Sequence, residues 1–188
     1  MRNVRSATSI SGVAGCLSLL LVLPVGAVNI TFDGELLDRP CQIDYASLNQ
    51  TVQFLERPAK DFHESPGKGP AEKFNIRLIQ CNANTIWKTV KLKFNGNRES
   101  AMKEQADYFL KVTGVNAGKL AIGLLDTDGI TPLKLGDAHN RGMGNSVNRD
   151  ALQFDFKAYV QATPDAIAQK SVQPGEYKSV VNFELVYE

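Results

Sequence analysis

The chain has 188 residues, with 21 lysines and arginines, 20 aspartates and glutamates, and a formal net charge of +1. Because the basic residues are scattered and nearly balanced by acidic ones, the charge pattern argues against nucleic acid or an anionic membrane surface as a partner. The length predicts one domain that can bury a proper core.

The N-terminus has the three parts of a secretory signal. Arg2 and Arg5 precede a short apolar stretch, and small residues follow it up to Ala27. The apolar stretch is about a dozen residues long, which is too short to cross a bilayer comfortably. We therefore predict a signal peptide at residues 1–27 that is cleaved after Ala27, and a soluble, exported mature protein.

The predicted mature chain begins with an alternation of apolar residues. A period of two is typical of a strand with one buried face. We expect residues 28–37 to form an N-terminal extension, separate from the domain at residues 38–188. The positions of this alternation are Val28, Ile30, Phe32, Gly34 and Leu36.

Two cysteines remain after the predicted cleavage, Cys41 and Cys81. An even pair in an exported chain predicts a disulfide, and closing a loop of about 40 residues contributes about 4 kcal/mol in the chain-entropy model. A two-cysteine metal site is the alternative, but the two histidines, His63 and His139, do not lie at ligand spacing. We expect neither a metal nor another cofactor.

The middle of the chain is typical of short strands separated by polar loops. Alternating apolar residues predict strands at 51–54, 74–81, 90–94, 120–124 and 152–160. Only residues 100–107 are compatible with a helix, and glycines or prolines predict loops at 58–70 and 136–149. Together these elements predict an all-β fold, an immunoglobulin-like β-sandwich.

The C-terminal stretch, Gly175–Glu188, carries the most informative alternation. Its odd-numbered positions are mostly apolar, which predicts one strand with a buried face. Those positions are Gly175, Tyr177, Ser179, Val181, Phe183, Leu185 and Tyr187. Alternating segments at both ends of a small domain suggest a sheet protein that pairs strands with partners. The alternative is that both segments are ordinary strands of one complete sandwich.

Residue patterns that would indicate catalysis are weak. Asp126–Gly129 resembles a fragment of a calcium loop, but the remaining ligands and the closing glutamate are missing, so a hairpin turn is the better interpretation. The pair His63 and Glu64 could transfer protons in principle, yet it lies in a loop and is better explained as solvated. Trp87 could stack on a sugar, although a lone tryptophan more often packs. We predict that the protein is not an enzyme and has no small-molecule substrate.

The two ends of the chain resemble those of pilin subunits from bacterial chaperone–usher pili. That family has a tyrosine next to the last residue and a glycine fourteenth from the C-terminus, and here those positions hold Tyr187 and Gly175. The cysteine spacing and the alternation after the signal are also similar. Within the family, three segments are most similar to the adaptor that joins the tip fibrillum of P pili to the rod: Leu36–Cys41, Lys111–Gly118 and Ala158–Pro164.

The resemblance implies an immunoglobulin-like β-sandwich that lacks its final strand and leaves a groove. A periplasmic pilus chaperone, and later a neighbouring pilin subunit, would supply the missing strand. The donor strand of this chain would comprise Val28, Ile30, Phe32, Gly34 and Leu36, with Gly34 where a groove leaves no room for a side chain. The chaperone and groove residues would be Gly175, Tyr177, Val181, Phe183, Leu185, Tyr187 and Glu188, the last through its terminal carboxylate.

The function implied by the resemblance is that of a structural adaptor, exported through the periplasm and assembled by an outer-membrane usher into the fimbrium on the cell surface. Another pilin type, such as a tip minor, rod or terminator subunit, is an alternative. An adhesin that binds host glycans is a further alternative, but it would need an extra receptor-binding domain for which the length leaves no room. A periplasmic enzyme would need a constellation of residues that the sequence does not offer.

Overall fold

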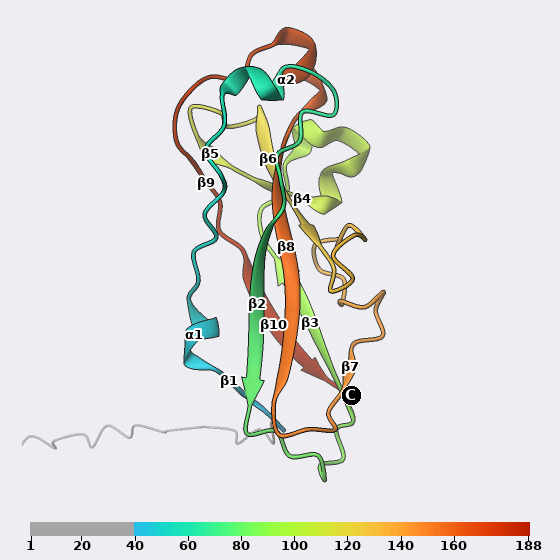
Figure 1. Ribbon diagram of the computed structural model, residues 1–188. Helices are drawn as coiled ribbons and strands as arrows, with labels where there is room; N and C mark the ends of the chain where they lie inside the picture. Colours follow the sequence, from blue (N-terminus) through green and yellow to red (C-terminus); the bar gives the residue numbers. More distant parts are fainter. Residues whose placement is uncertain (1–39) are drawn as a thin grey trace, which may run out of the picture. The chain divides into compact units, whose positions relative to one another are not determined.

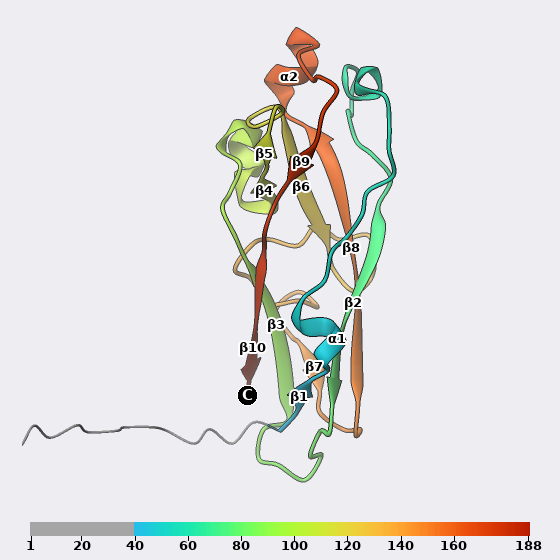
Figure 2. The same ribbon diagram turned by 90° about the vertical axis from the view of Figure 1, so that its left-hand side faces the viewer.

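The computed structural model describes residues 40–188. The predicted signal peptide at 1–27 and the predicted extension at 28–37 lie outside these residues. The part from residue 40 onward forms two facing antiparallel sheets, and a hydrophobic core lies between them (Figure 1, Figure 2). This arrangement matches the predicted all-β sandwich.

The sheets are built from strands that are distant in the sequence. The first sheet has the order β1 (Gln42–Ile43), β2 (Glu72–Ile79), β8 (Leu152–Ala162), β6 (Leu120–Leu125) and β4 (Phe109–Lys111). The second sheet has the order β10 (Asn182–Tyr187), β3 (Thr89–Asn95) and β7 (Asn145–Ser146). A short ribbon pairs β5 (Thr113–Gly114) with β9 (Tyr177–Lys178).

The helices are short, and a side chain caps each of the two α-helices. The α-helices are α1 (Tyr45–Leu48) and α2 (Pro164–Gln169), and the 3-10 helices are η1 (Ala59–Phe62) and η2 (Ser100–Tyr108). The side chains of Asp44 and Thr163 accept hydrogen bonds from the first-turn N–H groups of α1 and α2, at 3.1 and 3.4 Å. The predicted helix at 100–107 is a 3-10 helix in the structure. It is interrupted at Lys103, where φ is +57°.

Alternating apolar residues on facing strands build the core. Val90, Leu92 and Phe94 of β3 point inward and are buried, as are the inward residues of β8. The rings of Phe94 and Phe156 meet edge to face with centroids 5.0 Å apart, a geometry that adds to the stabilisation from burial. The period-two pattern therefore identified these strands because each has one buried face.

Strand β6 is buried on both faces, which the sequence pattern did not predict. Leu120, Ile122 and Leu124 face the main core, as expected, and η2 packs near the opposite face. There a second cluster comprises Met102, Phe109, Ala121, Leu125 and Tyr159. At Gly123 of this strand an added Cβ would lie 2.5 Å from the Tyr159 ring, so the glycine makes room for that ring.

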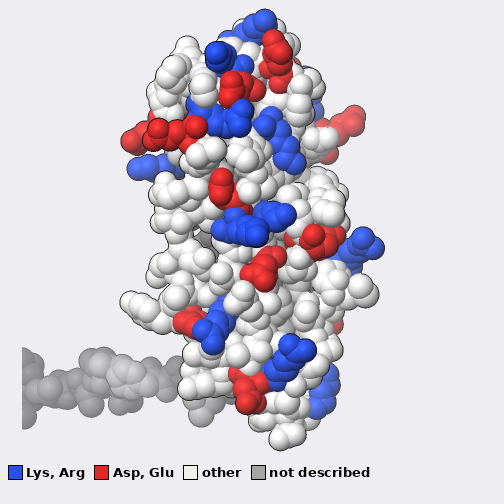
Figure 3. Space-filling model, viewed as in Figure 1, with Lys and Arg blue, Asp and Glu red and all other residues white. Residues whose placement is uncertain are grey.

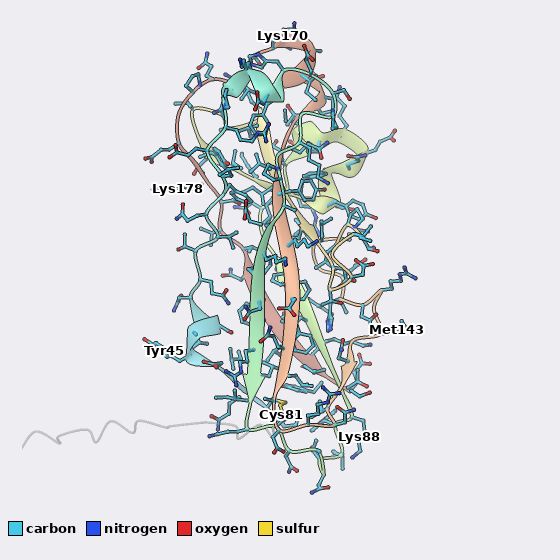
Figure 4. All side chains as sticks on the ribbon, viewed as in Figure 1. Tyr45, Cys81, Lys88, Met143, Lys170 and Lys178 are labelled. Atoms are coloured by element: carbon cyan, nitrogen blue, oxygen red, sulfur yellow. A yellow bond between two sulfur atoms is a disulfide. The ribbon has the colours of Figure 1, made fainter. Side chains whose placement is uncertain are left out.

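The predicted disulfide between Cys41 and Cys81 is confirmed. Both cysteines are buried, one just before β1 and the other two residues after the end of β2. Figure 4 shows Cys81 toward the same end of the domain as Lys88, which lies just before β3. The covalent link thus fastens the start of the described chain to the first sheet.

The β5–β9 ribbon positions the chain that leads into β10, and Gly114 makes it possible. Gly114 has φ of +100°, and an added Cβ would lie 2.4 Å from the backbone oxygen of Glu176. We expect Gly114→Ala to lower the free energy of unfolding by about 1–3 kcal/mol. This loss would appear as a lower midpoint of urea-induced unfolding. Gly118→Ala is the matched control, since Gly118 has φ of +73° with nothing within 4 Å. Equal losses in the two variants would contradict the proposed clash.

Candidate functional site

Strand β10 is paired along only one edge. Its register with β3 runs from Asn182 opposite Asn95 to Tyr187 opposite Val90. Within residues 40–188, no strand pairs with the other edge of β10. An unpaired strand edge presents backbone N–H and C=O groups to any chain that can add a strand. This edge is the starting point for a functional site.

The inward side chains of β10 cover the core incompletely. Val181, Phe183 and Leu185 pack against core residues but remain partly exposed, whereas Asn182 and Glu184 face outward. The ring of Phe183 lies 6.3 Å from that of Phe94, one of the most buried aromatic residues. The strand therefore contacts the core from its margin, and apolar surface stays accessible beside it.

The extended segment at 51–55, which follows α1, lies across this exposed apolar surface from β10. Figure 2 shows the segment running along the side of the sandwich between β10 and β2. Val52 and Phe54 are partly buried against the core, and their neighbours are exposed. The predicted strand at 51–54 is therefore wrong in one respect: the segment is extended and alternates, but it is not part of a sheet.

We call this strip of partly exposed apolar side chains the open edge. It lies between β9–β10 and the segment at 51–55, and the rings of Phe54 and Tyr177 approach to 6.2 Å across it. A small pocket, lined in part by Phe54, Phe62 and Tyr177, lies at this position. The residues of the open edge are Val52, Phe54, Tyr177, Val181, Phe183, Leu185 and Tyr187.

The C-terminal end of β10 is fastened to the start of β3. The backbone oxygen of Glu188 accepts hydrogen bonds from the N–H groups of Lys88 and Thr89, both at 2.8 Å, and its N–H donates to Thr89 at 2.9 Å. The side-chain carboxylate of Glu188 pairs with Lys91 at 2.6 Å. The Tyr187 hydroxyl lies 3.5 Å from the carbonyl oxygen of Cys41. The last two residues thus hold the strand in register.

The structure brings most of the predicted groove residues together. Tyr177, Val181, Phe183, Leu185 and Tyr187 all belong to the open edge. Gly175 does not, because the predicted continuous strand at 175–188 is instead divided into β9 and β10, and Gly175 precedes both. The predicted donor residues, Val28 to Leu36, lie outside the described residues.

Two residues of the open edge were missed as site residues: Val52 and Phe54. Their signal was present in the alternation at 51–54. Nothing in the sequence, however, indicates that this segment lines the same strip as β10. Only the sandwich brings it there.

Other candidate sites have structural explanations. Asp128 closes the turn predicted at 126–129, and its carboxylate accepts hydrogen bonds from the backbone and hydroxyl of Thr131 and from the N–H of Ile130. These bonds lower the pKa of Asp128 to about 2. His63 is within 2.9 Å of the carbonyl oxygen of Val172, which ties its loop to the end of the domain that holds α2.

Residues 40–188 contain no group of three or more histidine, cysteine or acidic side chains that could hold a metal ion. In the same part of the chain, no helix has the length and hydrophobicity needed to span a membrane. On the face shown in Figure 3, basic and acidic side chains are interspersed rather than gathered into one patch. The open edge is therefore the feature of this domain that needs a functional explanation.

Comparison with known proteins assigns the family. The family profile described as "Fimbrial protein" matches residues 30–188. This chain belongs to the fimbrial protein family. It is 47% identical over 176 residues to the protein named fimbrial adapter PapK of Escherichia coli, covering 92% of this chain and 97% of that protein. It is also 30% identical to the fimbria A protein of Serratia marcescens, with coverage of 93% and 92%.

A solved structure supports the same fold. The crystal structure of the P pilus rod subunit PapA superposes with a TM-score of 0.63 at 23% identity, covering 80% of this chain and 100% of that chain. The domain is thus a pilin domain, an immunoglobulin-like sandwich that is incomplete. Family membership also confirms that the protein is a structural pilus subunit of the cell surface and not an enzyme.

Proposed function

We propose that this protein is the adaptor subunit of a chaperone–usher pilus, which joins the tip fibrillum to the rod by donor-strand exchange. The observation that carries the proposal is the open edge, where β10 has a strand partner on one side and partly exposed apolar residues on the other. The adaptor role is supported by the 47% identity to a protein named as a fimbrial adapter.

In this proposal the open edge accepts a strand from another polypeptide. The backbone of the incoming strand continues the sheet beyond β10, and its alternate side chains enter the strip between β10 and the segment at 51–55. There they cover residues such as Phe54, Phe183 and Leu185. The accepted strand therefore completes both the sheet and the core of this subunit.

The donor side of the function falls to residues 28–37. Val28, Ile30, Phe32 and Leu36 would enter the open edge of a neighbouring subunit, and burying four such side chains contributes roughly 6–12 kcal/mol before ordering costs. Each backbone hydrogen bond of the new ladder adds about 0.5–1.5 kcal/mol. Exchange of one strand for another can therefore produce a durable fibre without a nucleotide or cofactor.

The route to the fibre follows from the predicted signal and the open edge. After cleavage behind Ala27, a periplasmic chaperone would lend its own strand and bind the terminal carboxylate of Glu188. The chaperone would then release the subunit at an outer-membrane usher, where the neighbouring pilin subunit replaces it. Covering the open edge at every stage prevents the aggregation that exposed apolar surface beside a free strand edge favours.

The donor role predicts the outcome of substitution at Gly34. Gly34→Asn or Gly34→Trp should leave chaperone-bound subunit at its normal level but block docking onto the neighbour, because a side chain would clash with the floor of the neighbour's groove. Docking is measured by the ladder of subunit complexes that resist dissociation in detergent. Thr31→Asn is the matched control, since it places the same side chain at an alternate position. Normal incorporation of the Gly34 variants into fibres would contradict the donor role.

A rod subunit is the competing assignment within the family. A rod subunit must add to copies of itself, whereas an adaptor joins two different neighbours. Mixing the purified, chaperone-bound subunit with itself and with candidate neighbours separates the two assignments. Growth of long homopolymers would overturn the adaptor role while leaving the strand-accepting role of the open edge intact.

A further inference from the structure

A histidine inside the sandwich holds the long connection between β6 and β7. His139 has 0% of its surface exposed. Its Nδ1 accepts a hydrogen bond from the N–H of Leu92 in β3 at 2.9 Å, and its Nε2 lies 2.9 Å from the Oδ1 of Asn145 in β7. Because Nδ1 must act as an acceptor, the proton of the neutral ring is on Nε2, which donates to Asn145.

The surroundings of the ring oppose a positive charge. The ring packs edge to face against Phe154 and Phe156 of β8, with centroids 5.0 and 6.0 Å away. Burial lowers the pKa of His139 below its ordinary 6.5, and the hydrogen bond to Asn145 and the charge of Asp126, just after β6, offset part of this effect. The other charged groups of the packed elements line the hollow beside this connection: Lys91 and Lys93 of β3, Glu188 after β10, and Lys134, Asp137 and Arg141 of the connection itself.

The same connection is attached to β3 by a short series of backbone bonds. Gly136 donates to Phe94 at 2.9 Å, His139 to Leu92 at 2.9 Å and Val147 to Lys88 at 2.8 Å. Strand β7 adds only two residue pairs with β3. His139 lies in the middle of this series and bonds to Leu92 twice, once through its backbone and once through its ring.

We propose that His139 is an acid-sensitive latch, which holds residues 136–147 on β3 while its ring is neutral and releases them when the ring is protonated. A proton from solvent would bind the Nδ1 lone pair, so that Nδ1 becomes a donor facing the Leu92 N–H, also a donor. The buried hydrogen bond is then lost, and the charged ring can be hydrated only if the segment moves outward. The consequence is that β3 gains a free edge where β7 had been.

The direction of the pH effect follows from the lowered pKa. At pH values well above 6.5 the ring is neutral in both the closed and the open segment, and the latch has its full strength. As the pH falls below 6.5, the open segment binds a proton before the closed one does, so opening becomes progressively more favourable. The proposal concerns only the contact between residues 136–147 and β3. It does not depend on the strand-accepting role of β10.

Hydrogen exchange at pH 7.5 and pH 5.0 tests the latch on the mature protein in its complex with the periplasmic chaperone. After correction for intrinsic exchange rates, we expect protection of Leu92 and of residues 136–147 to fall several-fold, and at most about 30-fold, at the lower pH. Protection of the β2–β8 ladder should not change. A uniform loss across both sheets, or no loss at all, would overturn the proposal.

The chain offers a matched control, because it has two histidines. His139→Gln should remove the pH dependence at residues 136–147, whereas His63→Gln should retain it. The reverse result would show that the latch is not His139. If His139→Gln does not fold, a nitrogen NMR titration of the wild-type rings replaces it. The Nδ1 of His139 should then be protonated over the same pH range in which the segment opens, and segment opening with that ring still neutral would refute the latch.

Discussion

Deletion of Tyr187 and Glu188 should reduce the amount of folded subunit in the periplasm at least tenfold. The deletion removes three backbone hydrogen bonds between Glu188 and the residues that begin β3, worth about 0.5–1.5 kcal/mol each. It also removes the Tyr187 side chain from the core margin, worth about 1.5–3 kcal/mol. The combined loss of about 3–7.5 kcal/mol is comparable with the whole stability of a typical domain.

Two comparisons make the deletion informative. Glu188→Gln keeps the backbone bonds and removes only the exposed ion pair with Lys91, so it should change stability by at most about 1 kcal/mol. If the subunit also needs a chaperone at this end, the deletion variant should fail to co-purify with it. An unchanged periplasmic yield of the deletion variant would contradict the importance of this terminus.

Replacement of both Cys41 and Cys81 by alanine should lower the free energy of unfolding by about 2–5 kcal/mol. The disulfide joins residues separated by 40 positions, and without it the unfolded chain regains the freedom of that loop. The measurement is the midpoint of urea-induced unfolding of the purified protein, compared with wild type.

Chemical reduction of the wild-type protein provides the control for this variant, because it breaks the same bond without changing the packing of either cysteine. Reduced wild type and the double variant should unfold at nearly the same urea concentration. A double variant as stable as oxidised wild type would show that the bond does not stabilise the fold.

The longer strands could be predicted from the sequence because each has a buried face with period two. Strands β2, β3 and β8 fall where apolar alternation placed them. The strands of two residues, such as β7, could not be predicted, since two residues show no periodicity. Likewise, α1 is a single turn set by the Asp44 cap, and its apolar residues Tyr45 and Leu48 are largely exposed.

Only part of the open edge could be predicted from the sequence. The alternation in β10 and at 51–55 has the form of two strands, and both segments are extended. Only β10 is part of a sheet, because strand assignment needs a hydrogen-bonded neighbour and the segment at 51–55 has none in the described part of the chain. From the sequence, His139 is a candidate metal ligand and nothing more, since its burial depends on β3 and β8, which are distant in the sequence.

The position of the disulfide has a mechanical consequence for a fibre under tension. A pull on the chain before residue 41 reaches Cys41 and passes through the sulfur atoms directly to Cys81. The residues between them, with β1, α1 and the segment at 51–55, form a covalently closed loop. While the bond is intact, a pull between the chain before residue 41 and the chain after residue 81 cannot draw this loop out, so one wall of the open edge keeps its length under load.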